Sequence, residues 1–225
     1  MHTIIHQGGY SDVRWAGGGG DVVIRGNLFY HAEAMDIMVN QNDWDGTWGD
    51  FTFENNLFGP SGGMLVILGS SFTGITVRHN TVLFALNDVW TSIFGRTMAS
   101  SGLADPSSQS YLFQIWGNGP EAQVYNNIFA GAGSSTSPSN RIKQDKGVVT
   151  NNIFIPDDID HLPYTAIPGN IQDFIDGGGV LGQLVTGSAA QNAGTTAYTY
   201  PANDVYDNPR SDGAPDIGAV ERNAP

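Results

Sequence analysis

The stretch Ala122-Gln-Val-Tyr-Asn-Asn127-Ile-Phe129 decides the fold, because four other segments of the chain repeat its pattern. In each segment, apolar and polar residues alternate up to an asparagine, and an apolar residue stands two positions after it. The other segments are Val22–Phe29, Phe51–Phe58, Ile75–Val82 and Gly147–Phe154. The five asparagines are Asn27, Asn56, Asn80, Asn127 and Asn152, at spacings of 29, 24, 47 and 25 residues. A strand unit of this length cannot bury its apolar face alone, so the sequence predicts an all-β solenoid of about five to six stacked coils.

Each asparagine also fixes which side chains face the core, because side chains alternate between the two faces of a strand. Residues three and five positions before it are predicted to point inward: Val22, Ile24, Phe51, Phe53, Ile75, Val77, Ala122, Val124, Gly147 and Val149. Residues two and four positions before it are predicted to point outward: Val23, Arg25, Thr52, Glu54, Thr76, Arg78, Gln123, Tyr125, Val148 and Thr150. The asparagines are predicted to stack as a ladder, each amide bonding to the next coil about 4.8 Å away. His79 stands where other repeats carry asparagine, which predicts a hydrogen bond at the turn for its ring.

The repeats divide the chain into two parts. Residues 1–155 are predicted to form the coils, with an insertion at 85–109, and residues 156–225 a C-terminal cap packed on them. Residues 3–5 match the end of an earlier repeat, so we expect the chain to begin in the middle of a coil. We expect further coils upstream, or a partner such as a second copy in a homo-oligomer, to cover this open end.

Composition limits the partners. The chain of 225 residues carries 9 basic and 22 acidic residues, a net charge of −13, which argues against nucleic acid and against anionic membranes. No apolar run approaches the roughly 20 residues of a membrane-spanning helix. There is no cysteine, which excludes disulfides and cysteine-based metal sites.

A second set of strands precedes the repeats, and its outward positions predict a shallow polar face. These positions hold Asp12, Arg14, Asp36, Met38, Asn40, Gln114, Trp116, Arg141, Lys143 and Asp145. An indole can stack on the apolar side of a sugar ring while the polar groups bind its hydroxyls, so the face suits a polysaccharide. The alternative is an ordinary solvated sheet surface.

The repeats resemble the right-handed parallel β-helix superfamily, which includes pectate-lyase-like proteins. The segments Gly187–Gly194, Asp207–Arg210 and Gly213–Glu221 are similar to the closing segment of many secreted bacterial β-helix proteins. The resemblance implies a right-handed fold, a secreted or cell-surface location and a polysaccharide partner. Met1–His6 has neither the basic nor the long apolar region of a signal peptide, which we expect processing to have removed. The superfamily holds lyases, hydrolases, epimerases, tailspikes and adhesins, so the resemblance leaves the activity open.

Lys143 and Arg141 are the basis of the lyase hypothesis. Members of the superfamily use lysine or arginine as a base, and calcium or a second basic residue to neutralise the substrate carboxylate. Lys143 would then be the base and Arg141 the clamp on a uronate carboxylate. The alternative is that these residues, with Lys146, only solubilise the last coil.

Asp12 and Asp36 are predicted to occupy equivalent positions on adjacent coils. Two carboxylates about 5 Å apart suit a retaining glycoside hydrolase, and two such acids can also hold calcium. The third alternative is that the two carboxylates are ordinary surface charges that repel each other weakly and have no function.

The segment from Gln41 to Asp50 is similar in composition to a calcium loop. Asp43, Asp45 and Asp50 would be the metal ligands, although the final glutamate of an EF-hand is missing. The alternative is a plain acidic turn, and Trp44 and Trp48 would equally serve as platforms for sugars.

Three functions follow from these residues. The first is a lyase that cleaves an acidic, uronate-containing polysaccharide by β-elimination. The second is a non-catalytic module, adhesin-like or tailspike-like, that binds glycan. The third is a glycoside hydrolase that uses Asp12 and Asp36.

Overall fold

The computed structural model describes residues 20–29, 37–39, 48–58, 65–68, 72–83, 113–116, 122–130, 142–143, 147–155, 166–168, 182–184, 187–211 and 213–222. Within these ranges the regular elements are all β-strands, so the described part of the chain is all-β as predicted. No helix among the described residues has the length and apolarity needed to cross a membrane.

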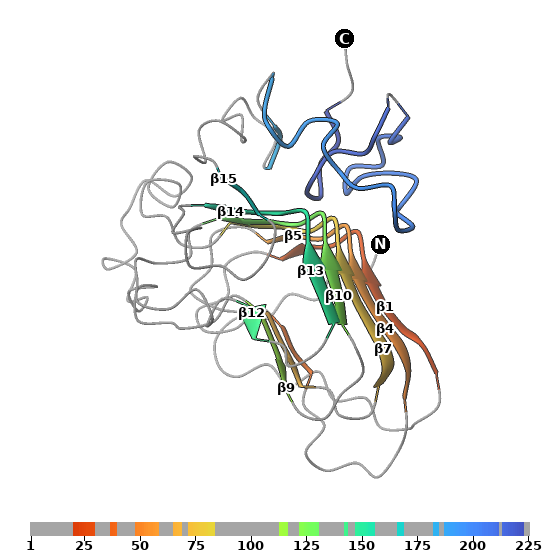
Figure 1. Ribbon diagram of the computed structural model, residues 1–225. Coiled ribbons are helices and arrows are strands. Elements are labelled where there is room, and N and C mark those ends of the chain that lie inside the picture. Colours follow the sequence, from red (N-terminus) through yellow and green to blue (C-terminus); the bar gives the residue numbers. More distant parts are fainter. Residues whose placement is uncertain are drawn as a thin grey trace, which may run out of the picture.

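The strands belong to three parallel sheets (Figure 1). They are β1 (Val22–Arg25), β2 (Leu28–Phe29), β3 (Ile37–Val39), β4 (Trp48–Glu54), β5 (Leu57–Phe58), β6 (Leu65–Leu68), β7 (Phe72–Arg78), β8 (Thr81–Leu83), β9 (Phe113–Trp116), β10 (Ala122–Tyr125), β11 (Ile128–Ala130), β12 (Ile142–Lys143), β13 (Gly147–Thr150), β14 (Asn152–Ile155) and β15 (Ala166–Pro168). The sheet orders are β1-β4-β7-β10-β13, β15-β14-β11-β8-β5-β2 and β12-β9-β6-β3. From β1 to β14, neighbours within a sheet are three strands apart along the chain, so each triplet of strands adds one strand to every sheet.

The core lies behind the first of these sheets. Phe51, Ile75 and Ala122 are aligned on β4, β7 and β10, and all three are buried. Phe53, Val77 and Val124 form the next buried row. In the outer strands β1 and β13, Val22, Ile24 and Val149 are only partly buried, because each strand has one described neighbour. The predicted inward face is therefore confirmed in the three middle strands, where it is fully buried. Gly147 in β13, which was also predicted to point inward, is exposed.

The asparagine ladder is also confirmed. Each side-chain Oδ1 from Asn56 to Asn152 accepts two hydrogen bonds from the preceding asparagine, one from its backbone N–H and one from its Nδ2, at 2.9–3.1 Å. Each Nδ2 of these residues also donates to a backbone carbonyl of the preceding repeat. The ladder thus provides hydrogen-bond partners for the asparagine side chains, which are buried from Asn56 onward. It also fixes the register between neighbouring repeats.

The residue before each ladder asparagine turns the chain from one sheet to the next. Asn55, His79, Asn126 and Asn151 have φ between 52° and 56°, and Gly26 has φ 67° at the equivalent position of the first described repeat. Asparagine and glycine adopt this left-handed conformation more readily than β-branched residues do. These residues form a second row, here called the turn row.

The described C-terminal segment, residues 187–211 and 213–222, packs along the turn row (Figure 1). Backbone carbonyls of Asn203, Thr195 and Ala193 accept hydrogen bonds from the side chains of Asn55, Asn126 and Asn151. Close docking also requires a glycine at position 218, since a Cβ there would lie 2.7 Å from Thr81 Oγ1. The segment predicted as a cap therefore contacts the side of the repeats, one after another.

Candidate functional site

Four residues that were predicted to belong to the polar face lie in strands of the sheet β12-β9-β6-β3. Lys143 in β12 is aligned with Gln114 in β9, and the row continues through Val66 in β6 to Met38 in β3. Trp116 stands two residues beyond Gln114 and is aligned with Leu68. The backbone thus brings the predicted base, Lys143, beside Gln114 on neighbouring strands, whose spacing in a sheet is about 4.8 Å.

Several predicted site residues lie outside the described part of the chain. They are Asp12, Arg14, Asp36, Asp43, Trp44, Asp45 and Arg141. Trp48 is described as the first residue of β4, aligned with Phe72. The paired-carboxylate and sugar-platform hypotheses therefore stay predictions.

Asp50 is the described member of the predicted calcium loop. It is exposed in β4, its Oδ1 accepts a hydrogen bond from the Thr73 hydroxyl at 2.6 Å, and its backbone N–H donates to Asp21 Oδ1 at 2.9 Å. Among the described residues, no group of three or more histidine, aspartate or glutamate side chains is placed to hold a metal ion. The calcium site, which also needs Asp43 and Asp45, stays a prediction.

The outer face of the sheet β1-β4-β7-β10-β13 carries an ion-pair network. Glu54 is completely buried between Arg25, whose Nε contacts Oε1, and Arg78, whose Nε and Nη2 lie 2.5 Å from Oε2. Arg78 Nη1 also donates to the Tyr125 hydroxyl at 3.1 Å and to Thr199 Oγ1 at 2.5 Å. Glu54 and Tyr125 were predicted to point outward; they do project from the outer face, but neighbouring side chains and the C-terminal segment bury them.

A polar groove of about 340 Å³ lies beside this network, here called the outer groove. Its floor comes from β4, β7 and β10 and includes Thr52, Thr76 and Gln123, with Arg78 and Tyr125 at one side. Tyr198 and Thr199 of the C-terminal segment contact Tyr125 and Arg78 and complete the lining on that side. The sequence does not predict this groove. Its lining includes residues far apart in the chain, such as Tyr125 and Thr199, which are separated by 74 positions and meet only in the folded chain.

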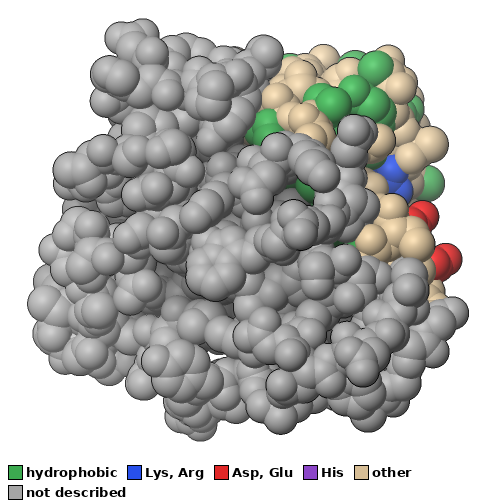
Figure 2. Space-filling view, turned by 60° about the horizontal axis from the view of Figure 1, so that its bottom comes forward, with side chains coloured by type: hydrophobic (Ala, Val, Ile, Leu, Met, Phe, Trp, Pro, Cys, Tyr) green, Lys and Arg blue, Asp and Glu red, His purple; other side chains and the backbone are tan. Residues whose placement is uncertain are grey.

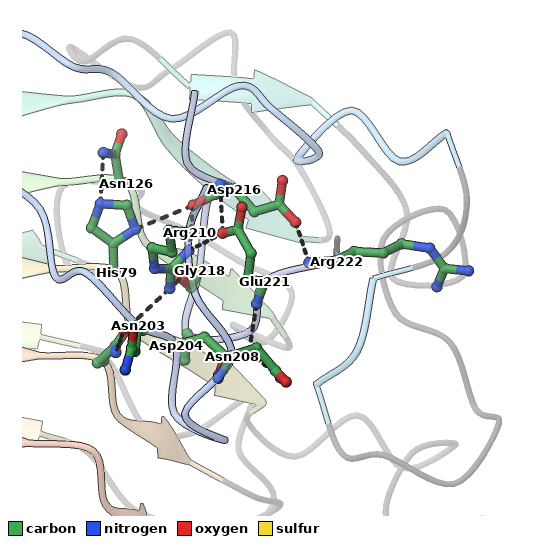
Figure 3. Close-up of polar contacts among 12 residues, drawn as sticks. His79, Asn126, Asn203, Asp204, Asn208, Arg210, Asp216, Gly218, Glu221 and Arg222 are labelled. Carbon is green, nitrogen blue, oxygen red and sulfur yellow. Dashed lines mark hydrogen bonds and ion pairs between the residues drawn. The ribbon is translucent and has the colours of Figure 1, made fainter. Parts of the chain in front are cut away.

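A second network is buried where the C-terminal segment meets the turn row (Figure 3). The Arg210 and Glu221 side chains are both fully buried, and Arg210 Nη1 lies 2.5 Å from Glu221 Oε2. Arg210 Nη2 donates to Asn55 Oδ1 and to the Gly218 carbonyl, both at 2.9 Å. Burial lowers the pKa of Arg210, and the Glu221 carboxylate opposes that change. Because both charged groups are fully buried and bonded across the contact, the network joins the C-terminal segment to the turn row.

His79 belongs to the same network. Its Nδ1 lies 3.2 Å from the Asp216 carbonyl, and its Nε2 lies 3.0 Å from Asn126 Nδ2 (Figure 3). These partners require a neutral ring that donates from Nδ1 and accepts at Nε2. Burial, followed by the charges of Arg210 and Arg78, lowers the pKa of His79 well below 6.5. The hydrogen bond at the turn predicted for this residue is confirmed.

Replacing His79 by asparagine, the residue of the equivalent turns, is expected to reduce the acid sensitivity of the fold. The pKa of His79 is lowered in the folded state. Below pH 6.5 the imidazole therefore binds a proton in the unfolded chain but stays neutral in the folded chain. His79 therefore lowers the free energy of unfolding by about 1.4 kcal/mol for each pH unit below 6.5, until the folded pKa is reached. Urea denaturation of the native chain and His79→Asn above and below pH 6.5 measures this difference. Parallel pH dependences of the two proteins would contradict it.

No protein-family model matches the chain, and no curated protein matches it.

Proposed function

We propose that the three parallel sheets are the sides of a right-handed parallel β-helix. Two features support this: the spacing of three strands between sheet neighbours and the continuous asparagine ladder. The handedness is the one that nearly all parallel crossover connections adopt. A stack of this kind offers long, regular outer faces, which suit extended polymers better than compact ligands.

We propose further that the chain is an extracellular lyase that cleaves an acidic polysaccharide by β-elimination. The observation that carries this proposal is the alignment of Lys143 with Gln114 on neighbouring strands of one sheet. Gln114 would bind a sugar hydroxyl beside the amine, and Arg141, two residues before Lys143, would bind the uronate carboxylate. Lys143 takes the proton from C5 of the uronate, a double bond forms between C4 and C5, and the bond from C4 to the glycosidic oxygen breaks. The leaving oxygen gains a proton from solvent.

The test is ultraviolet absorbance during incubation with a panel of uronate polysaccharides, with and without added calcium. The unsaturated uronate absorbs in the ultraviolet, so a lyase produces a steady rise. A rise that depends on calcium would point to Asp43, Asp45 and Asp50. A flat trace, with no new reducing ends, would contradict the enzyme and leave a glycan-binding module.

Lys143→Ala is expected to lower the turnover rate by about 10²–10⁴-fold, the usual contribution of a general base, while substrate binding persists. Lys146→Ala is the matched control, because Lys146 is the other lysine of the chain, and it should keep the native rate. Equal rates for Lys143→Ala and the native chain would exclude Lys143 as the base.

A further inference from the structure

The outer groove lies on a different sheet from Lys143 and has its own chemistry. Thr52, Thr76 and Gln123 are aligned on β4, β7 and β10, so their side chains form one row along the groove floor. Adjacent members of such a row are about 4.8 Å apart. A floor of two hydroxyls and one amide at regular spacing is suited to a ligand that has several hydroxyl groups.

The floor has unused capacity for hydrogen bonds. The hydroxyls of Thr52 and Thr76 and the amide of Gln123 make no hydrogen bond to any other residue that the structure describes. The same holds for the Tyr198 hydroxyl at the groove wall, within the described ranges. Four side chains that line one groove thus have no hydrogen-bond partner among the described residues, and a ligand could bind them.

The wall supplies an aromatic surface. The Tyr198 ring packs on Tyr125 with ring centroids 4.7 Å apart and an angle of 31° between the planes. Tyr125 is buried and anchored by hydrogen bonds to Arg78 and the Thr199 carbonyl, so it holds Tyr198 at the groove edge. Tyr198 itself is only partly buried. An aromatic ring beside hydroxyl-binding groups is the combination that recognises a sugar ring, which has an apolar face and polar edges.

The charges of the groove argue against an acidic ligand. Arg78 is its cationic side chain, but Glu54 and the hydrogen bonds to Tyr125 and Thr199 engage the guanidinium, and only 13% of the Arg78 side chain is exposed. Figure 2 shows another view of the described surface, which is mostly hydrophobic side chains and tan atoms, with small areas of acidic and basic side chains. Among the described residues that line this groove, a uronate would therefore find no cation that is not already engaged, whereas a neutral sugar needs only uncharged hydrogen-bond partners.

We propose that the outer groove binds a neutral sugar, as one residue or a short oligosaccharide. The volume of about 340 Å³ lies near the lower end of the range for small-molecule sites, about 300–1,000 Å³, and so fits one or two sugar rings. Thr52, Thr76 and Gln123 bind the hydroxyls, and the Tyr198 ring covers the apolar face. This site is independent of the proposed lyase chemistry: it recognises neutral glycan and retains it while another face meets acidic glycan.

The test is titration calorimetry of the full chain with glucose, galactose, mannose, xylose and their disaccharides, with galacturonate for comparison. At least one neutral sugar should bind, and Thr76→Val and Thr52→Val should each weaken its binding about tenfold, as the loss of a hydrogen bond does. Thr150→Val is the matched control, because Thr150 is on the outer face of β13 in the same sheet but does not line the groove. It should bind as the native chain does.

The outcomes separate this proposal from the lyase. Neutral-sugar binding that survives Lys143→Ala and is lost in Thr76→Val supports the groove, whether or not the chain cleaves uronates. Both threonine variants keep a β-branched residue in a strand, and a native melting temperature confirms that they fold. Binding of galacturonate alone, no binding of any neutral sugar, or equal binding by the native chain, Thr52→Val and Thr76→Val would overturn the proposal.

Discussion

Replacing Arg210 by methionine is expected to lower the free energy of unfolding by about 3–5 kcal/mol, the usual result of removing one partner of a buried ion pair. Both side chains of the Arg210–Glu221 pair are fully buried. Without the guanidinium, the Glu221 carboxylate stays buried without its countercharge, and Asn55 Oδ1 and the Gly218 carbonyl each lose a donor. Urea denaturation measures the change.

Arg25→Met is the matched control for this prediction. Arg25 also pairs with a buried glutamate, Glu54, but 59% of its own side chain is exposed and Arg78 remains as a second partner. An exposed pair contributes about 0–1 kcal/mol, so the control should lose no more than that. The double change of Arg210→Met with Glu221→Leu should recover part of the loss, because no buried charge then remains. If Arg210→Met and Arg25→Met destabilised the chain equally, the buried pair would not hold the segment.

The repeat made the core predictable. The alternation of Phe51, Thr52 and Phe53 assigns faces directly, because a strand has a period of two. The asparagine ladder followed from the same repeat, and so did the role of His79, which occupies an asparagine position. These features depend on residues that are equivalent in successive repeats, and equivalence can be read from spacing alone.

The C-terminal contacts were not predictable in the same way. The sequence marked residues 187–221 as a closing segment, but nothing in its spacing shows that Arg210 reaches Asn55, 155 residues earlier. The outer face of β10 shows the same limit: Tyr125 was predicted to point outward, and its burial depends on Tyr198 and Thr199. The groove wall, and with it the neutral-sugar hypothesis, therefore emerged only from the structure.

The arrangement of the predicted catalytic residues could be predicted only in part. The sequence placed Gln114 and Lys143 among the outward positions of one predicted face, and the strand register aligns the two residues on neighbouring strands. The chemistry of that row depends on where the amine lies relative to substrate, which no spacing determines. The assay of Lys143→Ala and Lys146→Ala addresses that question directly.

Asn127→Ala is expected to lower the free energy of unfolding by at least about 3 kcal/mol, because each buried polar group left unsatisfied costs about 1–3 kcal/mol. Asn127 Oδ1 accepts from the backbone N–H and the Nδ2 of Asn80, both at 2.9 Å. Its Nδ2 donates to the carbonyls of Val77 and Tyr125 and to Asn152 Oδ1. The two N–H groups of Nδ2 thus serve three acceptors, and alanine removes all of these contacts at a fully buried position.

Asn27→Ala is the matched control at the end of the described ladder. Asn27 is only partly buried, and its Nδ2 donates to Asn56 Oδ1 and the Arg25 carbonyl. Water can reach the groups that this change exposes, so we expect a loss of about 1 kcal/mol, the net value of an ordinary hydrogen bond. Urea denaturation of both variants tests whether the ladder is cooperative along its length. A loss for Asn127→Ala within about 0.5 kcal/mol, the range of surface substitutions, would mean that the ladder contributes little at that position and that apolar burial alone sets the register.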